Sequence, residues 1–203
     1  MDPILADSAT AYKVAAVAGY LLGAVPFGLV LTRAAGLGDL RRIGSGNIGA
    51  TNVLRTGNKA LAALTLALDI GKGAAAVWLG GLIGGATAAI IAGLAAFFGH
   101  LYPLWLRFKG GKGVATALGV WAAWHWAAGA ALAGVWLVFA GVGRFSSLAA
   151  LAAAVAAPLV MLALGKTVLI GPTALMSAFM VWRHRGNIER LLKGTEPRIG
   201  KKD

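Results

Sequence analysis

The chain has 203 residues, of which 59% are hydrophobic and only 13% are charged. A soluble domain is typically about 45–50% apolar and about 25% charged, so this composition excludes an ordinary water-soluble domain and also a disordered chain. Lys and Arg number 19 against 7 Asp and Glu, which gives a formal net charge of +12. A hydrophobic chain with this basic excess is either a nucleic-acid binder or a membrane protein whose cationic loops lie on one side.

Mostly apolar stretches bounded by charged residues predict seven membrane spans, because about 20 mostly apolar residues are needed to cross a bilayer. The uncharged run 113–143 is too long for one crossing, and Trp124-His125-Trp126 near its middle is typical of a membrane interface, so it is divided there. In chain order the predicted spans are residues 14–32, 60–83, 87–106, 114–124, 127–143, 146–164 and 167–182. No domain boundary is evident, so residues 1–203 are expected to form a single transmembrane domain.

The basic residues predict the orientation of these spans. Sixteen of the 19 Lys and Arg fall in the connections after the first, third and fifth spans and in the tail after the seventh. Cytoplasmic loops carry the excess of positive charge, so the N-terminus is expected outside and the C-terminus in the cytoplasm. The predicted fold class is an all-α integral membrane protein with seven transmembrane helices. A nucleic-acid function is not expected, because no soluble face remains to carry the charge.

The long first connection holds the first of three polar clusters, Gly44-Ser45-Gly46-Asn47-Ile48-Gly49-Ala50-Thr51-Asn52-Val53-Leu54-Arg55. Backbone N–H groups of such a glycine-rich loop can form an anion-binding nest, and the arginine adds a planar fork suited to phosphate. A flexible loop with a helix cap is the alternative interpretation.

The second cluster is Lys109-Gly110-Gly111-Lys112-Gly113-Val114-Ala115-Thr116, at the start of the fourth predicted span. Its glycines permit close approach by a ligand, the helix start offers free N–H groups, and Lys112 is a point charge. It is not a Walker A loop, because glycine rather than Ser or Thr follows the lysine. A basic turn that touches lipid headgroups fits equally well.

The third cluster, residues 183–196, is a basic amphipathic stretch after the last span, and such stretches commonly lie on anionic lipid. His184 at the membrane edge is nevertheless the best-placed titratable base in the chain. Asp69 and Lys72 lie three residues apart inside the second span and share a helix face. They are interpreted either as part of a functional site or as a structural ion pair.

Taken in order, Ser45-Gly46-Asn47 with Gly49-Ala50-Thr51-Asn52, then Gly110-Gly111-Lys112-Gly113, then His184-Arg185 with Asn187-Ile188 and Gly194-Thr195-Glu196, form a specific pattern. They resemble the three signature motifs of the acyl-phosphate-dependent glycerol-3-phosphate acyltransferases, the PlsY family. Asp69 with Gly71-Lys72-Gly73 and Gly99-His100 with Pro103 also resemble features of that family. The resemblance implies a multi-pass enzyme of the bacterial inner membrane with its active site facing the cytoplasm. The implied reaction moves a fatty acyl group from acyl-phosphate to the 1-hydroxyl of glycerol 3-phosphate, giving lysophosphatidic acid and phosphate in phospholipid synthesis.

This resemblance, together with the chemistry of the residues, leads to a predicted site. The expected catalytic residues are His184, Lys112, Arg55 and Ser45. The expected substrate-binding and phosphate-binding residues are Ser45, Gly46, Asn47, Gly49, Thr51, Asn52, Arg55, Gly110, Gly111, Lys112, Gly113 and Asn187. Asp69, Lys72 and Glu196 are expected to support them.

Two candidates remain open for the group that takes the hydroxyl proton, namely His184 and a substrate phosphate oxygen. Another acyltransferase pattern pairs His with an Asp five residues later, but here that residue is Glu189, and five residues do not share a helix face. An acyl-phosphate is already activated, so no covalent intermediate, cofactor or metal is expected. The expected partners are the two substrates and membrane lipid, with no nucleic acid, and the protein is expected to be a monomer.

The main alternative function is a membrane transporter of an organic phosphate, with the glycine-rich segments as half-helix anion sites. Against it, no inverted repeat is evident and the polar clusters lie at one side rather than at the midplane. A metal-dependent lipid phosphotransferase fits less well, since few acidic residues lie near the predicted cytoplasmic face to serve as ligands.

Overall fold

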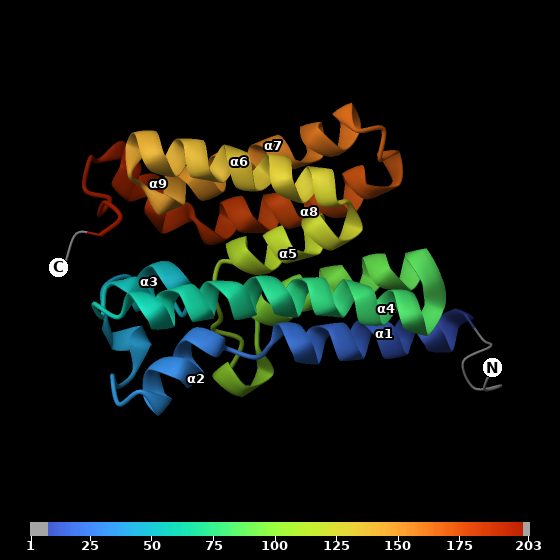
Figure 1. Cartoon of the computed structure of the whole chain (residues 1–203), viewed down its shortest axis with the longest axis horizontal. Helices are drawn as coiled ribbons and strands as arrows, with labels where there is room; N and C mark the ends of the chain where they lie inside the picture. Colours follow the sequence, from blue (N-terminus) through green and yellow to red (C-terminus); the bar gives the residue numbers. More distant parts are fainter. Residues whose placement is uncertain (1–7, 201–203) are drawn as a thin grey trace.

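A computed structural model of the chain describes residues 8–200, and within that range all regular structure is helical (Figure 1). The all-α prediction is confirmed for these residues. In chain order the elements are α1 (Ser8–Gly23), α2 (Phe27–Ala34), the 3₁₀ turn η2 (Leu40–Arg42), α3 (Ala50–Leu54), α4 (Lys59–Leu101), the 3₁₀ turn η3 (Leu104–Leu106), α5 (Val114–Trp124), α6 (Trp126–Gly143), α7 (Ser146–Ala163), α8 (Thr167–Arg183) and α9 (Arg185–Leu192).

The helix α4 carries both the second and the third predicted spans. It folds back on itself at Gly84 and Gly85, whose φ/ψ angles of −155°/28° and 71°/−158° interrupt the helix. A positive φ is readily available to glycine, so the Gly84-Gly85 pair separates the two arms where the prediction placed a short connection. Helices α5 to α8 begin and end within one residue of the predicted spans.

The first predicted span, residues 14–32, is not one helix. Helix α1 ends at Gly23, and α2 begins only at Phe27, after Pro26. Proline has no N–H and disfavours helical backbone before it, which explains the break. The third predicted span is interrupted for a similar reason, since α4 ends at Leu101 just before Pro103 and only the short turn η3 follows.

Small residues allow the helices to approach closely. A Cβ atom added at Gly19 or Gly23 of α1 would collide with the backbone of Ala92 or Ala96 in the second arm of α4. In the same way Gly119 of α5 packs against the backbone of Ile70 in the first arm. Contacts between small residues are how helices associate within lipid, where hydrophobic burial provides little driving force.

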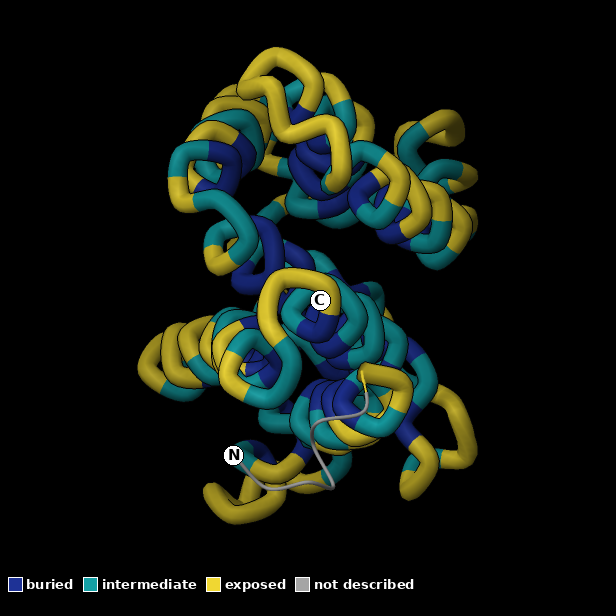
Figure 2. The backbone as a smooth tube through the Cα atoms, turned by 90° about the vertical axis from the view of Figure 1, so that its right-hand side faces the viewer, coloured by how far each residue is buried: buried dark blue, intermediate teal, exposed yellow. Residues whose placement is uncertain are grey.

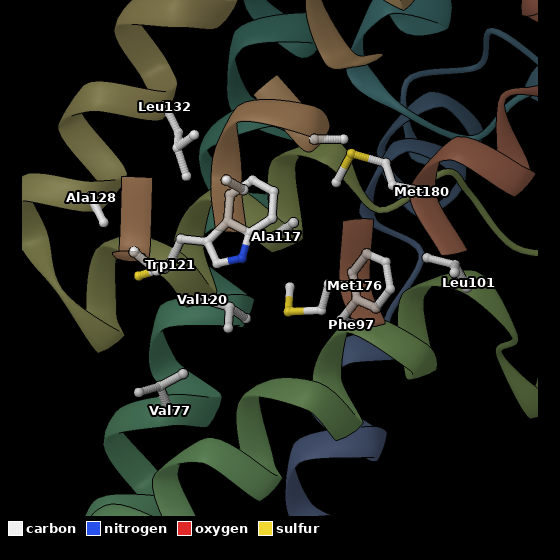
Figure 3. Close-up of a cluster of buried hydrophobic side chains, with 13 residues drawn as sticks. Val77, Phe97, Leu101, Ala117, Val120, Trp121, Ala128, Leu132, Met176 and Met180 are labelled. Carbon is white, nitrogen blue, oxygen red and sulfur yellow. The ribbon is translucent and has the colours of Figure 1, made fainter. Parts of the chain in front are cut away.

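A buried cluster joins α4, α5 and α8 around the indole of Trp121 (Figure 3). Phe97, Val120, Met176 and Met180 are among the side chains packed there, and each is at most 2% exposed. The outward faces are apolar as well, because Trp126, Val142 and Val168 are 77%, 87% and 75% exposed. Figure 2 shows buried residues on the facing sides of the helices and exposed residues on their outer sides.

Within the described residues, four helical stretches are long and apolar enough to cross a membrane: Ser8–Ala34, Lys59–Leu106, Trp126–Gly143 and Ser146–Ala163. Helices α5 and α8 are apolar but shorter, at 11 and 17 residues. The apolar outer surface and the length of the four long stretches are those expected of a protein that lies within a bilayer.

Candidate active site

A cavity of about 930 Å³ lies where the three polar clusters meet. Nine residues of the segment 44–55 line one part of it, residues 112–115 a second part, and His184, Asn187 and residues 195–200 a third. From this polar end the cavity continues between apolar side chains of the membrane helices. These include Leu66 and Ile70 of α4, Leu118 and Trp121 of α5, Leu132, Trp136 and Leu137 of α6, and Ala150 and Ala153 of α7.

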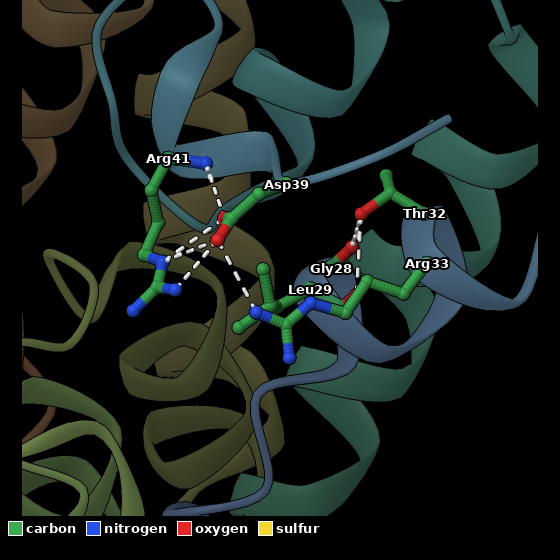
Figure 4. A network of polar contacts seen from close by, with 6 residues as sticks. All are labelled: Gly28, Leu29, Thr32, Arg33, Asp39 and Arg41. Carbon is green, nitrogen blue, oxygen red and sulfur yellow. Dashed lines mark hydrogen bonds and ion pairs between the residues drawn. The ribbon is translucent and has the colours of Figure 1, made fainter. Parts of the chain in front are cut away.

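Asp39 braces the connection that leads from α2 to the first cluster (Figure 4). Its carboxylate accepts hydrogen bonds from Arg41 Nε at 2.9 Å and Nη2 at 2.6 Å, and from Arg33 Nη2 at 3.2 Å. The hydrogen bonds from Arg41 hold the pKa of Asp39 well below its usual range. At the end of α2, Thr32 Oγ1 donates to the Gly28 carbonyl at 2.8 Å, which satisfies a buried hydroxyl.

Asn52 organises the first cluster. It is 2% exposed, and its Nδ2 donates to the carbonyl oxygens of Leu40, Ile43 and Asn47 at 3.0, 3.0 and 2.8 Å. Its Oδ1 accepts the backbone N–H of Ser45 at 3.2 Å. A buried amide that bonds this many loop groups fixes the loop conformation, because leaving any of those groups unpaired is costly. Asn52 therefore positions Ser45 at the cavity wall.

The second cluster is held by its neighbours through backbone groups. The amides of Gly110 and Gly111 donate to the carbonyls of Leu101 and His100, each at 3.0 Å. The carbonyls of the same two glycines accept Arg183 Nη2 at 2.7 Å and Nε at 3.1 Å. Neither glycine lines the cavity, so both lie behind it and support Lys112 and Gly113, which do line it.

Lys112 is a half-buried cation at the polar end of the cavity. Its Nζ donates to Asn187 Oδ1 at 2.5 Å. Burial lowers the pKa of Lys112 from 10.5 to about 8, and the positive charges of Arg190, Arg183 and Arg55 act in the same direction, while Glu196 opposes them. An ammonium group that is destabilised in this way favours binding of an anion, because a nearby negative charge stabilises the charged form of the lysine.

Glu196 connects α7 and α9 at the polar end. Its Oε1 accepts Ser147 Oγ of α7 and Asn187 Nδ2 of α9, both at 2.6 Å, and its Oε2 accepts Arg190 Nε at 2.7 Å. Burial by itself would raise the pKa of Glu196, but the hydrogen bonds from Ser147, Asn187 and Arg190 together lower it. Because Asn187 also accepts the Lys112 ammonium, Glu196 fixes the amide that orients Lys112.

His184 is 2% exposed and lines the same cavity. Its Nδ1 lies 2.7 Å from the Met180 carbonyl oxygen, which can only accept, so Nδ1 carries the proton and Nε2 keeps its lone pair. Burial lowers the pKa of His184 to about 4, and the Lys112 charge adds to this effect. The imidazole is thus neutral near pH 7 and offers an acceptor nitrogen.

A second buried polar group lies deeper, around Lys72. Its ammonium forms an ion pair with Asp69 Oδ1 at 2.6 Å, although the geometry is not that of a hydrogen bond. The same ammonium lies 2.9 Å from His100 Nδ1. It also donates to the Val25 carbonyl at 2.8 Å, a group that the break before Pro26 leaves without a helical partner. Asp69 and His100 line the cavity, whereas Lys72 stands behind them.

The structure brings most of the predicted site residues together. The cavity is lined by Ser45, Asn47, Gly49, Thr51, Asn52, Arg55, Asp69, Lys112, Gly113, His184, Asn187 and Glu196. Gly46, Gly110, Gly111 and Lys72 are close in the fold but are not part of the lining. For Gly110 and Gly111 the physical reason is that their amides are already bonded within the protein.

Comparison with known proteins identifies this arrangement. Residues 13–194 match the family described as glycerol-3-phosphate acyltransferase. The chain belongs to this family. The glycerol-3-phosphate acyltransferase of Maricaulis maris is 57% identical over 188 residues, which cover 93% of this chain and 87% of the relative. That of Jannaschia sp. is 53% identical over 201 residues, or 99% of both chains.

Two solved structures extend the likeness to three dimensions. The glycerol 3-phosphate form of PlsY, an integral membrane glycerol 3-phosphate acyltransferase, superposes with a TM-score of 0.88 at 38% identity, covering 93% of this chain and 96% of that one. A lysophosphatidic acid form of PlsY gives a TM-score of 0.86 at 37% identity, covering 93% and 95%. The chain is therefore a PlsY-type acyltransferase and a multi-pass, all-helical integral membrane protein, and the transporter alternative is set aside.

The candidate site is also held together by residues that the sequence analysis did not assign. Ser147 bonds Glu196 across 49 positions, and no local pattern marks it. Arg183 holds the second cluster and Arg190 bonds Glu196, yet in the sequence both belong to a run of basic residues typical of a lipid-facing segment. His100 has the sequence position of an ordinary helix end, yet in the structure it lines the cavity and lies 2.9 Å from the Lys72 ammonium.

Proposed function

We propose that this enzyme transfers a fatty acyl group from acyl-phosphate to the 1-hydroxyl of glycerol 3-phosphate, forming lysophosphatidic acid and inorganic phosphate. The observation that carries the proposal is a single cavity with a cationic end at Lys112 and Arg55 and an apolar continuation between membrane helices. An acyl-phosphate has an anionic head and an apolar tail, and it fits a cavity of that composition. Glycerol 3-phosphate is a soluble anion and needs only the polar end.

Binding follows from the charges at the polar end. Two phosphates brought close together repel each other, so several cations must neutralise them. Lys112 and Arg55 supply charge, while Ser45, Asn47 and Thr51 supply neutral hydrogen bonds from the first cluster. Asn187, held by Glu196, orients Lys112 and is placed to bond the glycerol moiety. Gly46, Gly110 and Gly111 act through the loop conformations that present these groups.

In the proposed reaction, the 1-hydroxyl oxygen forms a bond to the acyl carbonyl carbon, and the bond from that carbon to the phosphate oxygen breaks. The electron pair leaves with inorganic phosphate, and the hydroxyl proton passes to a base. Because the mixed anhydride is already reactive, positioning of the two substrates and neutralisation of the leaving phosphate supply most of the catalysis. Lys112 and Arg55 perform the neutralisation.

Two bases are available, and their basicities differ. A His184 imidazole with a pKa of about 4 is a weak proton acceptor, whereas the second ionisation of a phosphate monoester lies near pH 6. We propose that His184 Nε2 accepts the hydrogen bond of the hydroxyl and orients it, and that a substrate phosphate oxygen receives the proton. Bound anions raise the pKa of His184 above its value in the free enzyme and strengthen that hydrogen bond.

We further propose seven crossings, with the N-terminus outside and the active site facing the cytoplasm of a bacterial inner membrane. The seven crossings are α1 together with α2, each of the two arms of α4, and each of α5, α6, α7 and α8. All of them belong to one domain, and the protein is a monomer in this proposal. Figure 1 supports this, since α3 and α9 lie at one end of the molecule and the turn of α4 at the other. The ends of the proposed single domain, residues 1–7 and 201–203, lie outside the described residues.

The absence of cysteine makes the topology easy to test. Single cysteines at exposed positions 42 and 166 (Arg42→Cys and Lys166→Cys) are treated with a membrane-impermeant maleimide in intact spheroplasts. We expect labelling at 166 from outside, and labelling at 42 only after lysis. The reverse pattern would invert the proposed orientation.

The activity is tested with purified protein in detergent, supplied with palmitoyl phosphate and glycerol 3-phosphate. We expect equimolar lysophosphatidic acid and phosphate, and no product when acyl-coenzyme A replaces the acyl-phosphate. Lys112→Ala should abolish transfer while the protein keeps its thermal unfolding midpoint. Turnover with acyl-coenzyme A but not acyl-phosphate would refute the proposed donor.

A further inference from the structure

A second cavity, of about 510 Å³, adjoins the first at Lys112. Ser45, Lys112, Asn187 and Arg190 line both cavities, so the two spaces share one wall. The second cavity lies at the junction between α8 and α9, where Arg183, Arg185 and Glu189 complete its charged lining. No large apolar side chain is part of this lining, in contrast to the first cavity.

The charge of the second cavity is strongly positive. Lys112, Arg183, Arg185 and Arg190 stand against one acidic residue, Glu189. The ion pairs found among residues 8–200 assign a carboxylate to Arg190 but none to Arg183 or Arg185. Clefts lined by one sign of charge raise the local concentration of oppositely charged ligands.

Contacts with aromatic rings and backbone groups orient the two uncompensated arginines. Arg183 bonds the carbonyls of Gly110 and Gly111, and its guanidinium lies 5.7 Å from the Tyr102 ring centroid. Arg185 lies over the Trp182 ring at 4.7 Å. Stacking and backbone bonds leave the positive charge of a guanidinium in place, so both side chains form a fixed cationic wall.

We propose that the second cavity is the water-side inlet for glycerol 3-phosphate, and that its arginines draw the anion to Lys112 while acyl-phosphate reaches Lys112 from the apolar end of the first cavity. The inlet rests on the proposed function for the identity of its ligand. It gives the two substrates separate routes that meet at one cation. An anion without a tail is suited to the polar route, and a lipid is suited to the apolar one.

The test changes the charge of the inlet in both directions. Arg185→Gln removes one positive charge and Glu189→Gln removes the only negative one. Lys193→Gln is the opposite counterpart of the second variant, because it breaks the same exposed Glu189–Lys193 ion pair (2.7 Å) but leaves the Glu189 carboxylate uncompensated at the inlet. Arg42→Gln is the control for the first, since it removes an exposed cation elsewhere.

At low ionic strength we expect kcat/KM for glycerol 3-phosphate to fall about twofold to threefold in Arg185→Gln and to rise by a similar factor in Glu189→Gln. This is the size of the effect that one charge has on a doubly charged ligand within about a Debye length. Both changes should shrink in 1 M salt. Arg42→Gln should leave this kcat/KM near the wild-type value, whereas Lys193→Gln should lower it, because it leaves the Glu189 carboxylate uncompensated. The kcat/KM for acyl-phosphate should be unchanged in all four variants.

Three results would overturn the inlet: no increase in Glu189→Gln, a decrease in Arg42→Gln as large as in Arg185→Gln, or equal effects on both substrates. Affinity for glycerol 3-phosphate, measured by calorimetry on the same purified variants, gives the ordering without any acyl transfer. If wild-type protein fails to transfer acyl groups, the proposed function fails, whereas the affinity order still decides whether the inlet attracts the anion.

Discussion

The lowered pKa of Lys112 predicts an unusual loss of activity in mild base. A pKa of about 8 in place of 10.5 corresponds to about 3 kcal/mol of destabilisation of the ammonium form in the free enzyme. At pH 9 about a tenth of the Lys112 side chains would keep their charge, whereas an ordinary lysine would be almost fully charged. The ammonium is the form that binds phosphate, so binding must weaken as the pH rises through about 8.

We therefore expect kcat/KM for glycerol 3-phosphate to be level near pH 7, to fall by about half at pH 8 and by about tenfold at pH 9. Initial rates with freshly prepared acyl-phosphate kept well below its KM measure this quantity, because the rate then reports the ionisations of the free enzyme and the free substrates. The second ionisation of glycerol 3-phosphate lies near pH 6 and affects only the acidic side of the profile.

Lys112→Arg is the matched variant, since a guanidinium stays charged throughout this range. The basic fall should disappear in it, even if the absolute rate is lower. Calorimetric affinity for glycerol 3-phosphate at pH 7 and pH 9 provides the same comparison if the variant turns over too slowly. A wild-type profile that is level to pH 9.5, or an identical fall in Lys112→Arg, would refute the assignment of the titration to Lys112.

Three further predictions concern the groups around Lys112. Gly111→Ala should cut activity at least tenfold and lower the free energy of unfolding by about 1–3 kcal/mol, because the new methyl group would overlap the His100 ring. Gly134→Ala is the control, since its methyl group would meet no neighbour, and it should preserve activity and stability in the same assays. His184→Gln should lower kcat by about tenfold to a hundredfold, and the pH–rate profile should keep its shape between pH 6 and 8. If the variant instead loses the acidic limb of that profile, His184 is the base. Glu196→Gln should lower both kcat/KM for glycerol 3-phosphate and the thermal unfolding midpoint. A neutral amide has one acceptor oxygen and leaves at least one of the three donors unpaired, which costs about 1–3 kcal/mol of stability. An unchanged midpoint in a fluorescence melt would contradict this.

The amino-acid sequence by itself determined the helical class, most helix ends and the family. Hydrophobic runs and the residues that interrupt them are local signals, so Gly84-Gly85 and Trp124-His125-Trp126 mark the turns correctly. The three polar clusters are also local, and each carries its own chemistry in consecutive residues. Two local signals were undervalued. Pro26 divides the first predicted span into α1 and α2, and Pro103 interrupts the third.

Only the tertiary structure decided how these clusters work together. The contacts that define the site join distant positions: Lys112 to Asn187, Ser147 to Glu196, and Lys72 to the Val25 carbonyl that the break at Pro26 exposes. It also showed that the amides of Gly110 and Gly111 are bonded internally and that Arg183 supports them. A hydrogen bond depends on positions within a few tenths of an ångström, and those positions are set by helix packing across the whole chain rather than by neighbouring residues.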